Sequence, residues 1–151
     1  MIKAIDPLEY KVQIEEFYHS LIEEKLTFEL SLELILSSTH LYGLFSEEGE
    51  LLGFSGLRKK WCLKIFFVVV KKKAQGKGFG KQLTQICFDQ SVSGPLYLTV
   101  ERDNKKAQNL YRDLGMKVIS VQKKRIVMMK ARGLLGLFTK CSLFWIKPHS
   151  N

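Results

Sequence analysis

Cysteine and proline are scarce in this chain. Its 151 residues include three cysteines and three prolines. Cys62, Cys87 and Cys141 lack the C-x-x-C spacing of metal and redox sites, and their neighbours are apolar. We therefore expect reduced thiols in a hydrophobic core, with no disulfide and no metal, as is usual for a cytoplasmic protein.

Long apolar runs are also missing. Residues 1–7 contain no basic stretch that leads into an apolar one, so we expect no secretory signal. The apolar segment 133–146 is interrupted by Lys140 and is too short to cross a bilayer. Repeats, linkers and low-complexity tracts are absent as well. This pattern predicts a single domain over residues 1–151 and no membrane partner.

What the chain does have is positive charge. Its formal net charge is +9 at pH 7, and the basic residues gather at 71–81, 105–106 and 123–125. Basic proteins often bind nucleic acid, anionic membranes or acidic ligands. We interpret 123–125 as a solvated basic surface. We expect the lysines of 71–81 to face phosphate.

The first half of the chain has the periodicity of two helices and three strands. Asp6 and Pro7 are typical of an N-cap and a first helical position. The expected inner face of that helix is Ile14, Phe17, Tyr18 and Leu21. A second helix is expected at 29–37, strands at 41–46 and 51–57 with a turn at 47–50 between them, and a buried central strand at 62–70.

The second half reads as helix, strand, helix and strand. A helix should run from the glycines near residue 78 to about Ser91. The other expected elements are a strand at 96–100, a helix capped by Asp103 or Asn104, and a strand at 116–121. That last helix should bury Ala107, Leu110, Tyr111 and Leu114 and end at Gly115. Residues 126–129 fit a strand, or a loop or helix that leads to a final strand at 141–147; we favour the second arrangement.

This order of elements predicts an α/β fold with a mixed, mostly antiparallel central sheet and helices on both faces. The three early strands should be antiparallel because short turns join them. The strands on either side of the glycine-led helix should be parallel neighbours. The order fits neither a doubly wound dinucleotide fold nor a barrel.

The glycine-rich turn at 76–80 has the features of a phosphate site. It follows an apolar strand and opens a helix, whose first N–H groups and dipole attract anions. A P-loop requires Gly-x4-Gly-Lys-Ser/Thr, which the spacing here does not satisfy. A dinucleotide fingerprint requires Gly-x-Gly-x-x-Gly, whereas here the third glycine comes one place early.

Two segments together carry a family resemblance. Gln75-x-x-Gly78-x-Gly80 resembles the acetyl-coenzyme A (acetyl-CoA) signature of the GNAT superfamily of N-acetyltransferases. Asn104-x-x-Ala107-x-x-x-Tyr111-x-x-x-Gly115-Met116 is similar to that family's Asn-x-x-Ala-x-x-x-Tyr-x-x-x-Gly-Phe pattern, and it follows in the same order. The resemblance covers roughly residues 41–121, and more loosely the tail at 144–147.

The resemblance implies a GNAT-like domain that transfers an acetyl group from acetyl-CoA, as cosubstrate, directly to an amine. Tyr111 would be the catalytic acid that protonates the leaving thiolate. A backbone N–H near Val68 would polarise the thioester carbonyl. The implied cofactor-binding residues are Val68, Val70, Gln75, Gly76, Lys77, Gly78, Phe79, Gly80, Lys81, Asn104 and Tyr111.

The general base and the acceptor do not follow from these motifs. The 62–70 strand has no carboxylate, and Glu101, Asp103 and His40 each have a structural interpretation as well. The acceptor, a small-molecule or peptide amine, should contact the first two helices, the turn at 47–50 and residues 122–140. A homodimer is one of the open oligomeric states.

Two other functions stay in view. A catalytically silent acyl-CoA-binding module would explain the missing base. A basic nucleic-acid-binding protein would use the net charge, but aromatic residues do not alternate with the basic clusters as base stacking requires.

Overall fold

The structure is a computed structural model that describes residues 1–24, 30–60, 63–90 and 94–131. The chain divides into two compact units, residues 1–90 and 91–151. The first unit carries the glycine loop, and the second carries the helix with Asn104 and Tyr111.

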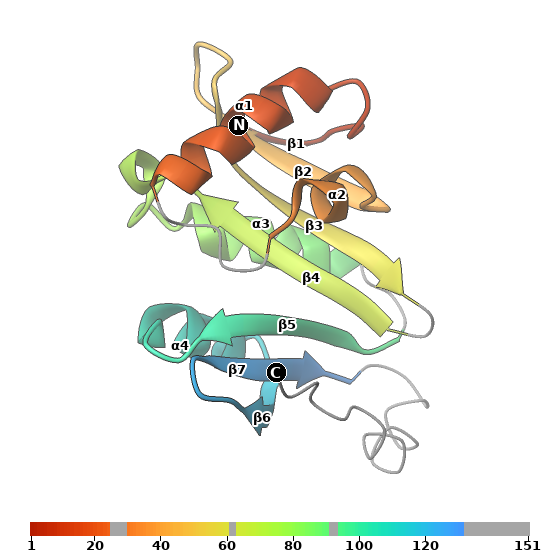
Figure 1. Cartoon of the computed structure of the whole chain (residues 1–151), viewed down its shortest axis with the longest axis vertical. Coiled ribbons are helices and arrows are strands. Elements are labelled where there is room, and N and C mark those ends of the chain that lie inside the picture. The colour runs from red at the N-terminus through yellow and green to blue at the C-terminus, as the bar shows by residue number, and fades with distance from the viewer. Residues whose placement is uncertain (25–29, 61–62, 91–93, 132–151) are drawn as a thin grey trace. The chain divides into compact units, whose positions relative to one another are not determined.

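An antiparallel sheet forms the framework of the first unit (Figure 1). Its strands lie in chain order: β1 (Ile2–Ala4), β2 (His40–Phe45), β3 (Leu51–Lys60) and β4 (Leu63–Val70). The three strands expected between residues 41 and 70, and their antiparallel pairing, are confirmed. The sequence does not predict β1, because a strand of three residues is too short to show an alternating pattern.

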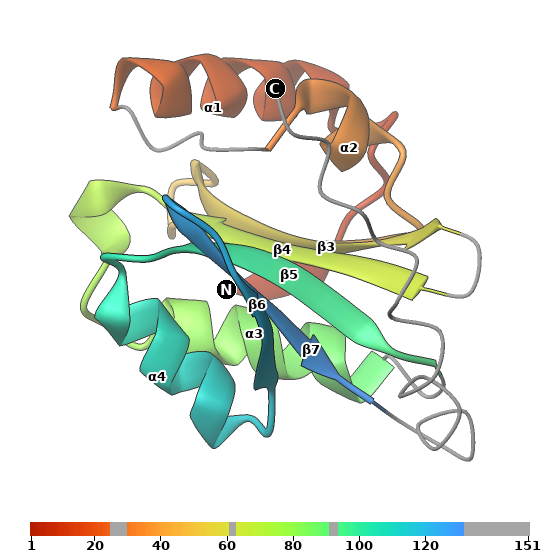
Figure 2. The same ribbon diagram turned by 60° about the horizontal axis from the view of Figure 1, so that its bottom comes forward.

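Two helices cover one face of this sheet and a third covers the other (Figure 2). α1 (Lys11–Glu23) and α2 (Leu32–Leu36) lie on one side, and α3 (Phe79–Gln90) lies on the opposite side. The Ser31 hydroxyl caps α2 by accepting a hydrogen bond from Leu34 N at 3.1 Å.

The first helix begins later than the sequence predicts. Asp6 Oδ1 accepts hydrogen bonds from Leu8 N at 2.7 Å and from Glu9 N at 3.3 Å, as an N-cap would. These bonds close turns, however, and the regular helix starts at Lys11, because Tyr10 has a non-helical backbone with φ −95° and ψ 15°. Asp6 therefore caps a turn that leads into α1.

The larger core of the first unit lies between its sheet and α1 and α2. Phe17 of α1 packs on Phe54 of β3 with ring centroids 4.8 Å apart, and both side chains are buried. The buried members of this core are Ile5, Ile14, Phe17, Leu21, Ile35, Leu41, Phe45, Leu51 and Phe54. Along β4, expected to be buried throughout, Phe66 and Val70 are buried but residues 67–69 are only half-buried.

A buried polar contact joins α3 to β3. Ser55 Oγ donates a hydrogen bond to Leu83 O at 3.0 Å and accepts one from Cys87 Sγ at 3.2 Å. Burial raises the pKa of the Cys87 thiol to about 12, so the sulfur stays protonated and unreactive at neutral pH. Cys87 is thus the reduced core thiol that the sequence predicts, while Cys62 and Cys141 lie outside the described residues.

The second unit is a smaller antiparallel sheet with one helix, α4 (Lys105–Asp113). Its strand order is β5 (Leu96–Glu101), β7 (Arg125–Lys130) and β6 (Lys117–Val121). The parallel pairing that we expect between the strands before and after α3 involves both units and stays a prediction.

β7 corrects the arrangement that we favoured for the tail. Residues 126–129 form a strand, not a loop or a helix, because β7 pairs with β5 on one edge and with β6 on the other. Met128, for example, lies opposite both Leu98 and Val118. The final strand expected at 141–147 lies outside the described residues.

Both ends of α4 are closed by local hydrogen bonds. Asn104 Oδ1 accepts from Ala107 N at 3.0 Å, so Asn104 and not Asp103 is the N-cap. At the other end Gly115 has φ 85°, Gly115 N donates to Arg112 O and Met116 N donates to Tyr111 O. This pair of bonds is a Schellman motif, which confirms the helix end predicted at Gly115.

The buried face of α4 differs from the prediction at one position. Gln108 is 1% exposed, whereas Ala107, Leu110 and Leu114 are only half-buried. Gln108 Nε2 donates to Glu101 O and to Arg102 O, both at 2.9 Å. A pattern search for apolar residues misses Gln108, although it ties α4 to the end of β5.

We expect Gln108→Leu to lower the free energy of unfolding by about 1–3 kcal/mol, because two carbonyl groups lose their buried donor. Urea denaturation followed by circular dichroism measures the change. Gln122→Leu, on the exposed turn of the same unit, is the matched control and should change stability by less than about 0.5 kcal/mol. Equal losses in the two variants would contradict this role of Gln108.

Candidate functional site

The glycine loop of the first unit connects β4 to α3. A short 3₁₀ turn (Lys72–Ala74) follows the strand, Gln75 is extended, and Gly76 and Gly78 have φ values of 82° and 80°. These left-handed conformations suit glycine, and they bend the chain into the first turn of α3 at Phe79.

The bend leaves a row of amide groups that have no acceptor in the described part of the chain. Among the described residues, the N–H groups of residues 76–80 donate to no backbone or side-chain atom, whereas Lys81 N and Gln82 N both donate to Gly78 O. A Cβ built on Gly76, Gly78 or Gly80 would meet no heavy atom within 4 Å. Successive free N–H groups at a helix start, open to a close approach, form a site for phosphate oxygens.

β4 turns the polar groups of Val68 and Val70 away from β3. Lys71 N donates to Leu52 O at 2.9 Å, which identifies Val70 and its partner Gly53 as a non-hydrogen-bonded pair. The register runs on to Val68 opposite Ser55 without a shift, so that pair is of the same kind. The N–H and C=O groups of both valines therefore point to the edge of β4 opposite β3.

Gln75 has a local role beside this edge. Its Nε2 donates to Val70 O at 2.9 Å, so the side chain closes the start of the loop against the strand that precedes it. The Val70 carbonyl thus already has a donor, whereas the N–H groups of residues 76–80 have no acceptor among the described residues.

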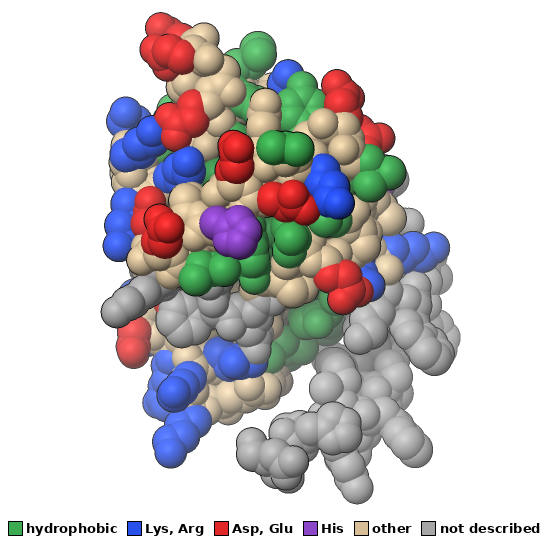
Figure 3. Space-filling model, turned by 45° about the horizontal axis from the view of Figure 1, so that its top comes forward, with side chains coloured by type: hydrophobic (Ala, Val, Ile, Leu, Met, Phe, Trp, Pro, Cys, Tyr) green, Lys and Arg blue, Asp and Glu red, His purple; other side chains and the backbone are tan. Residues whose placement is uncertain are grey.

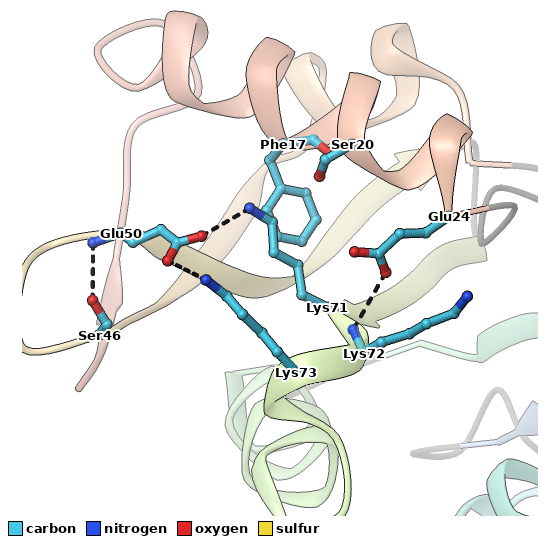
Figure 4. Close-up of polar contacts among 8 residues, drawn as sticks. All are labelled: Phe17, Ser20, Glu24, Ser46, Glu50, Lys71, Lys72 and Lys73. Atoms are coloured by element: carbon cyan, nitrogen blue, oxygen red, sulfur yellow. Dashed lines mark hydrogen bonds and ion pairs between the residues drawn. The ribbon is translucent and has the colours of Figure 1, made fainter.

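The lysines of 71–81 do not all face phosphate, which corrects our expectation (Figure 4). Glu50 Oε1 pairs with Lys71 Nζ at 3.1 Å, and Glu50 Oε2 pairs with Lys73 Nζ. The Lys71 ammonium also lies 5.1 Å from the centre of the Phe17 ring. Lys72, Lys77 and Lys81 form no ion pair with a described residue, so they are the cations left for an anionic ligand.

Glu50, which the sequence places in a turn, and Glu24, to which the sequence gives no role, both contact the lysine run that precedes the loop. Glu24 Oε2, just after α1, accepts from Lys72 N at 3.3 Å, and Glu50 lies on the turn between β2 and β3. The hydrogen bonds from Lys73 and Lys71 lower the pKa of the Glu50 carboxyl. The sequence could have indicated this pairing, because the turn at 47–50 is acidic and the run at 71–73 is basic.

The second unit places Asn104 and Tyr111 on α4. Asn104 uses Oδ1 as the helix cap, and its Nδ2 donates to no described residue. Tyr111 is 7% exposed, and burial raises the pKa of its phenol above the usual value. Tyr111 therefore stays protonated at neutral pH, as a general acid must be.

A general base does not emerge from the described residues. His40 is exposed, and its Nδ1 lies 3.2 Å from Thr39 Oγ1. Asp103 is exposed beside the α4 cap, and Glu101 lies opposite Arg125 at the end of β5. None of these contacts holds a carboxylate or an imidazole in a position suited to take a proton from an amine.

Other kinds of site find no support in the parts of the chain that the structure describes. On the face drawn in Figure 3, hydrophobic side chains are interspersed with acidic and basic ones. None of the described helices is both long and apolar enough to cross a membrane. No cluster of three or more His, Cys, Asp or Glu side chains there could hold a metal ion.

Comparison with known proteins identifies the family. The sequence profile of the acetyltransferase (GNAT) family matches residues 7–116. The chain belongs to the GNAT acetyltransferase family. The mycothiol acetyltransferase of Mycolicibacterium smegmatis is 38% identical over 90 residues, which are 54% of this chain and 30% of that protein. The N-alpha-acetyltransferase RimI of Mycobacterium tuberculosis is 28% identical over 97 residues, 61% of each protein. These matches span less than two thirds of either relative.

Solved structures show the GNAT fold. The ribosomal-protein-S18-alanine N-acetyltransferase of Escherichia coli superposes with a TM-score of 0.68 at 19% identity, covering 88% of this chain and 95% of that one. A spermidine N-acetyltransferase of Vibrio cholerae gives a TM-score of 0.66 at 17% identity, with coverages of 87% and 94%. At these identities the likeness concerns the fold alone, and it confirms the predicted α/β fold class.

We expect Gly80→Ala to separate ligand binding from folding. Alanine is the better helix former by up to about 1 kcal/mol, so unfolding free energy should stay equal or rise. The new methyl group would lie where a phosphate approaches the amides. Loss of one charge-assisted hydrogen bond, about 1.5–3 kcal/mol, should raise the Kd for coenzyme A at least about tenfold in calorimetric titration.

Gly49→Ala is the matched control for Gly80→Ala. Gly49 has φ 85° on the turn before β3, with open space around it. This variant should lose about 1–2 kcal/mol of stability without a change in the Kd for coenzyme A. If Gly80→Ala leaves the Kd for coenzyme A unchanged, the loop does not bind the phosphates of coenzyme A as we expect.

The ion pairs of Glu50 should make a small, pH-dependent contribution to stability. Since the folded-state pKa is lowered, the contribution is present above the unfolded pKa of about 4.3 and is lost as pH falls through the folded value. Because the carboxyl is exposed, we expect Glu50→Gln to cost less than about 1 kcal/mol at neutral pH and less than that at pH ~3. Urea titrations at both pH values test this, with Glu47→Gln as the unpaired control.

Proposed function

We propose that this chain is an acetyl-CoA-dependent N-acetyltransferase formed by residues 1–151 as one domain. It would transfer the acetyl group to a primary amine by direct attack, with both substrates bound together. The family match at 7–116 supports the single domain, because it runs across the boundary between the two compact units.

The observation that carries this proposal is the row of uncommitted N–H groups at residues 76–80, at the start of α3. It fits the pyrophosphate of acetyl-CoA, which supplies an activated acetyl thioester when bound. We assign the phosphate contacts to the amides of Gly76, Lys77, Gly78, Phe79 and Gly80, with Lys77 and Lys81 as counter-charges. Gln75 would shape this site through its bond to Val70 O instead of contacting the ligand.

The remaining roles follow from the chemistry of acyl transfer. Val68 and Val70 turn polar backbone groups to the edge of β4 opposite β3, and we assign the amide-containing pantetheine arm to their N–H groups and to the Val68 carbonyl. The Val68 N–H would stabilise the negative charge that develops on the thioester oxygen. Tyr111 would return a proton to the leaving thiolate, and Asn104 Nδ2 would hold the pantetheine arm.

Without a general base in the protein, only amines of low pKa would react readily. Removing the proton of a lysine amine with pKa ~10.4 at pH 7 costs about 4.6 kcal/mol, whereas an α-amine with pKa ~7.7–8.0 costs only about 1 kcal/mol. The chain would therefore favour α-amines or other weakly basic amines, with ordered water as the proton path. A kcat/KM profile that bends near pH 6–7 in the free enzyme would contradict this, because it would require a protein base.

The first unit offers a pocket where part of an acceptor could lie. It has a volume of about 230 Å³ and lies between α1 and the turn before β3. Its lining residues are Gln13, Glu16, Phe17, Gly49, Glu50, Leu51 and Lys71. This location agrees with the acceptor contacts expected from the first helix and the turn at 47–50. We place the reaction in the cytoplasm, where acetyl-CoA and reduced thiols occur together.

A silent acyl-CoA-binding module is the second candidate, favoured by the absence of a prepared base. Tyr111→Phe separates the two functions. If Tyr111 is the acid, the variant should lose at least about tenfold in kcat and keep its KM for acetyl-CoA. Its melting temperature should still rise on addition of coenzyme A. An unchanged kcat would remove Tyr111 from the mechanism.

The proposal as a whole is tested by an acceptor screen with acetyl-CoA, in which release of free thiol is followed. Small amines, polyamines and peptides with free N-termini form the panel, and the Gly80→Ala variant is the control for thiol release that does not depend on the site. A thermal shift with coenzyme A accompanies the screen, since ligand at 100 times Kd stabilises by about 2.7 kcal/mol. No shift at millimolar coenzyme A would refute the donor, and a shift without any transfer would favour the silent module.

A further inference from the structure

Five exposed basic residues lie at one end of the second unit. We call this group the basic end, and its members are Arg102, Lys105, Lys106, Lys123 and Lys124. They come from the end of β5, the first turn of α4 and the turn between β6 and β7, which lie at the same end of this unit (Figure 1).

Backbone hydrogen bonds hold these three segments together. Arg102 N donates to Lys124 O at 3.0 Å, and Glu101 lies opposite Arg125 in the β5–β7 ladder. Gln122 N donates to Arg125 O at 2.8 Å and closes the β6–β7 turn. Gln108 binds the carbonyls of Glu101 and Arg102, so the first turn of α4 is fixed to the same place.

No ion pair within the described parts of the chain offsets the charge of the basic end. Arg102, Lys105, Lys106, Lys123 and Lys124 are exposed, and among the described residues none of them forms an ion pair. Glu101 and Asp103 are the acidic residues in these segments. The glycine loop differs, because Glu50 pairs with two of its lysines. The N-terminus of α4 adds its positive dipole end to the basic end.

We propose that the basic end binds an acidic segment of a polypeptide acceptor and so brings its amine to the catalytic helix. This inference rests on the proposed function, since it names the class of acceptor. Asn104 caps α4 within the basic end, and Tyr111 follows on the same helix after roughly 10 Å at 1.5 Å per residue. A peptide with carboxylates a few residues from its N-terminus spans that distance.

A polypeptide suits this surface better than nucleic acid. Residues 101–108 and 120–126 contain no aromatic side chain, so the basic end has no platform on which bases could stack. Exposed lysines and arginines pair with carboxylates, and such surface pairs mainly speed association and raise specificity. Such a contribution weakens with salt, because the Debye length falls to about 8 Å at physiological ionic strength.

The test uses three peptides of equal length with the same free N-terminal residue, followed by an acidic, a neutral or a basic sequence. Initial rates of thiol release at saturating acetyl-CoA should give the lowest KM for the acidic peptide. That advantage should shrink as salt rises from about 50 to 200 mM, while the neutral peptide is unaffected. Equal KM values for all three peptides would overturn the proposal.

A double charge-reversal variant tests whether the preference for the acidic peptide arises at the basic end. Lys123→Glu with Lys124→Glu should raise the KM for the acidic peptide roughly tenfold and leave the KM for acetyl-CoA unchanged. The matched control is Lys59→Glu with Lys117→Glu, which makes the same change of net charge at exposed positions away from the basic end. An equal effect of the control pair, or a rise in the KM for acetyl-CoA instead, would overturn the assignment.

Binding measured without turnover separates this inference from the proposed function. Fluorescence anisotropy of a labelled acidic peptide, with the full chain and coenzyme A, should show binding that Lys123→Glu with Lys124→Glu weakens. If the peptide binds in this way but no peptide is acetylated, the result supports peptide binding at the basic end and contradicts the proposed transferase function. If duplex DNA displaces the acidic peptide and binds more tightly at about 150 mM salt, the surface is a nucleic-acid site and the proposal is wrong.

Discussion

The candidate site of the first unit depends on two glycines in the left-handed region of backbone space. Gly76 and Gly78 turn the chain so sharply between β4 and α3 that five successive N–H groups point away from every described acceptor. Unpaired backbone donors are costly when buried, so such a row persists in an open loop that water or an anion can reach. The loop therefore keeps five backbone donors that no described residue of this unit satisfies, and this makes it our candidate anion site.

Side chains on neighbouring elements keep that loop in place. Gln75 ties its start to Val70 O, and Glu50 and Glu24 bind the residues just before it. These contacts join the β2–β3 turn and the end of α1 to the start of the loop. The single negative charge of Glu50 also offsets part of the combined charge of Lys71 and Lys73.

In the second unit, local hydrogen bonds fix the helix α4. Asn104 and Gly115 close the two ends of α4, and Gln108 anchors its start to the end of β5. Lys130 Nζ donates to Leu114 O and so adds a donor to the last turn of the helix. The helix that carries Tyr111 is thus fixed at both ends, and its first turn is part of the basic end.

The sequence by itself determined the features whose chemistry is local. Glycine spacing, helix caps and alternating apolar residues predicted the loop, the end of α4, most strands and the family, because each depends on neighbours within a few residues. Only the tertiary structure decided the strand at β7, the burial of Gln108 and the pairing of Glu50 with Lys71 and Lys73. These features join residues that are distant in the chain, and hydrogen-bond geometry and ion pairing between them act only after the fold has brought them together.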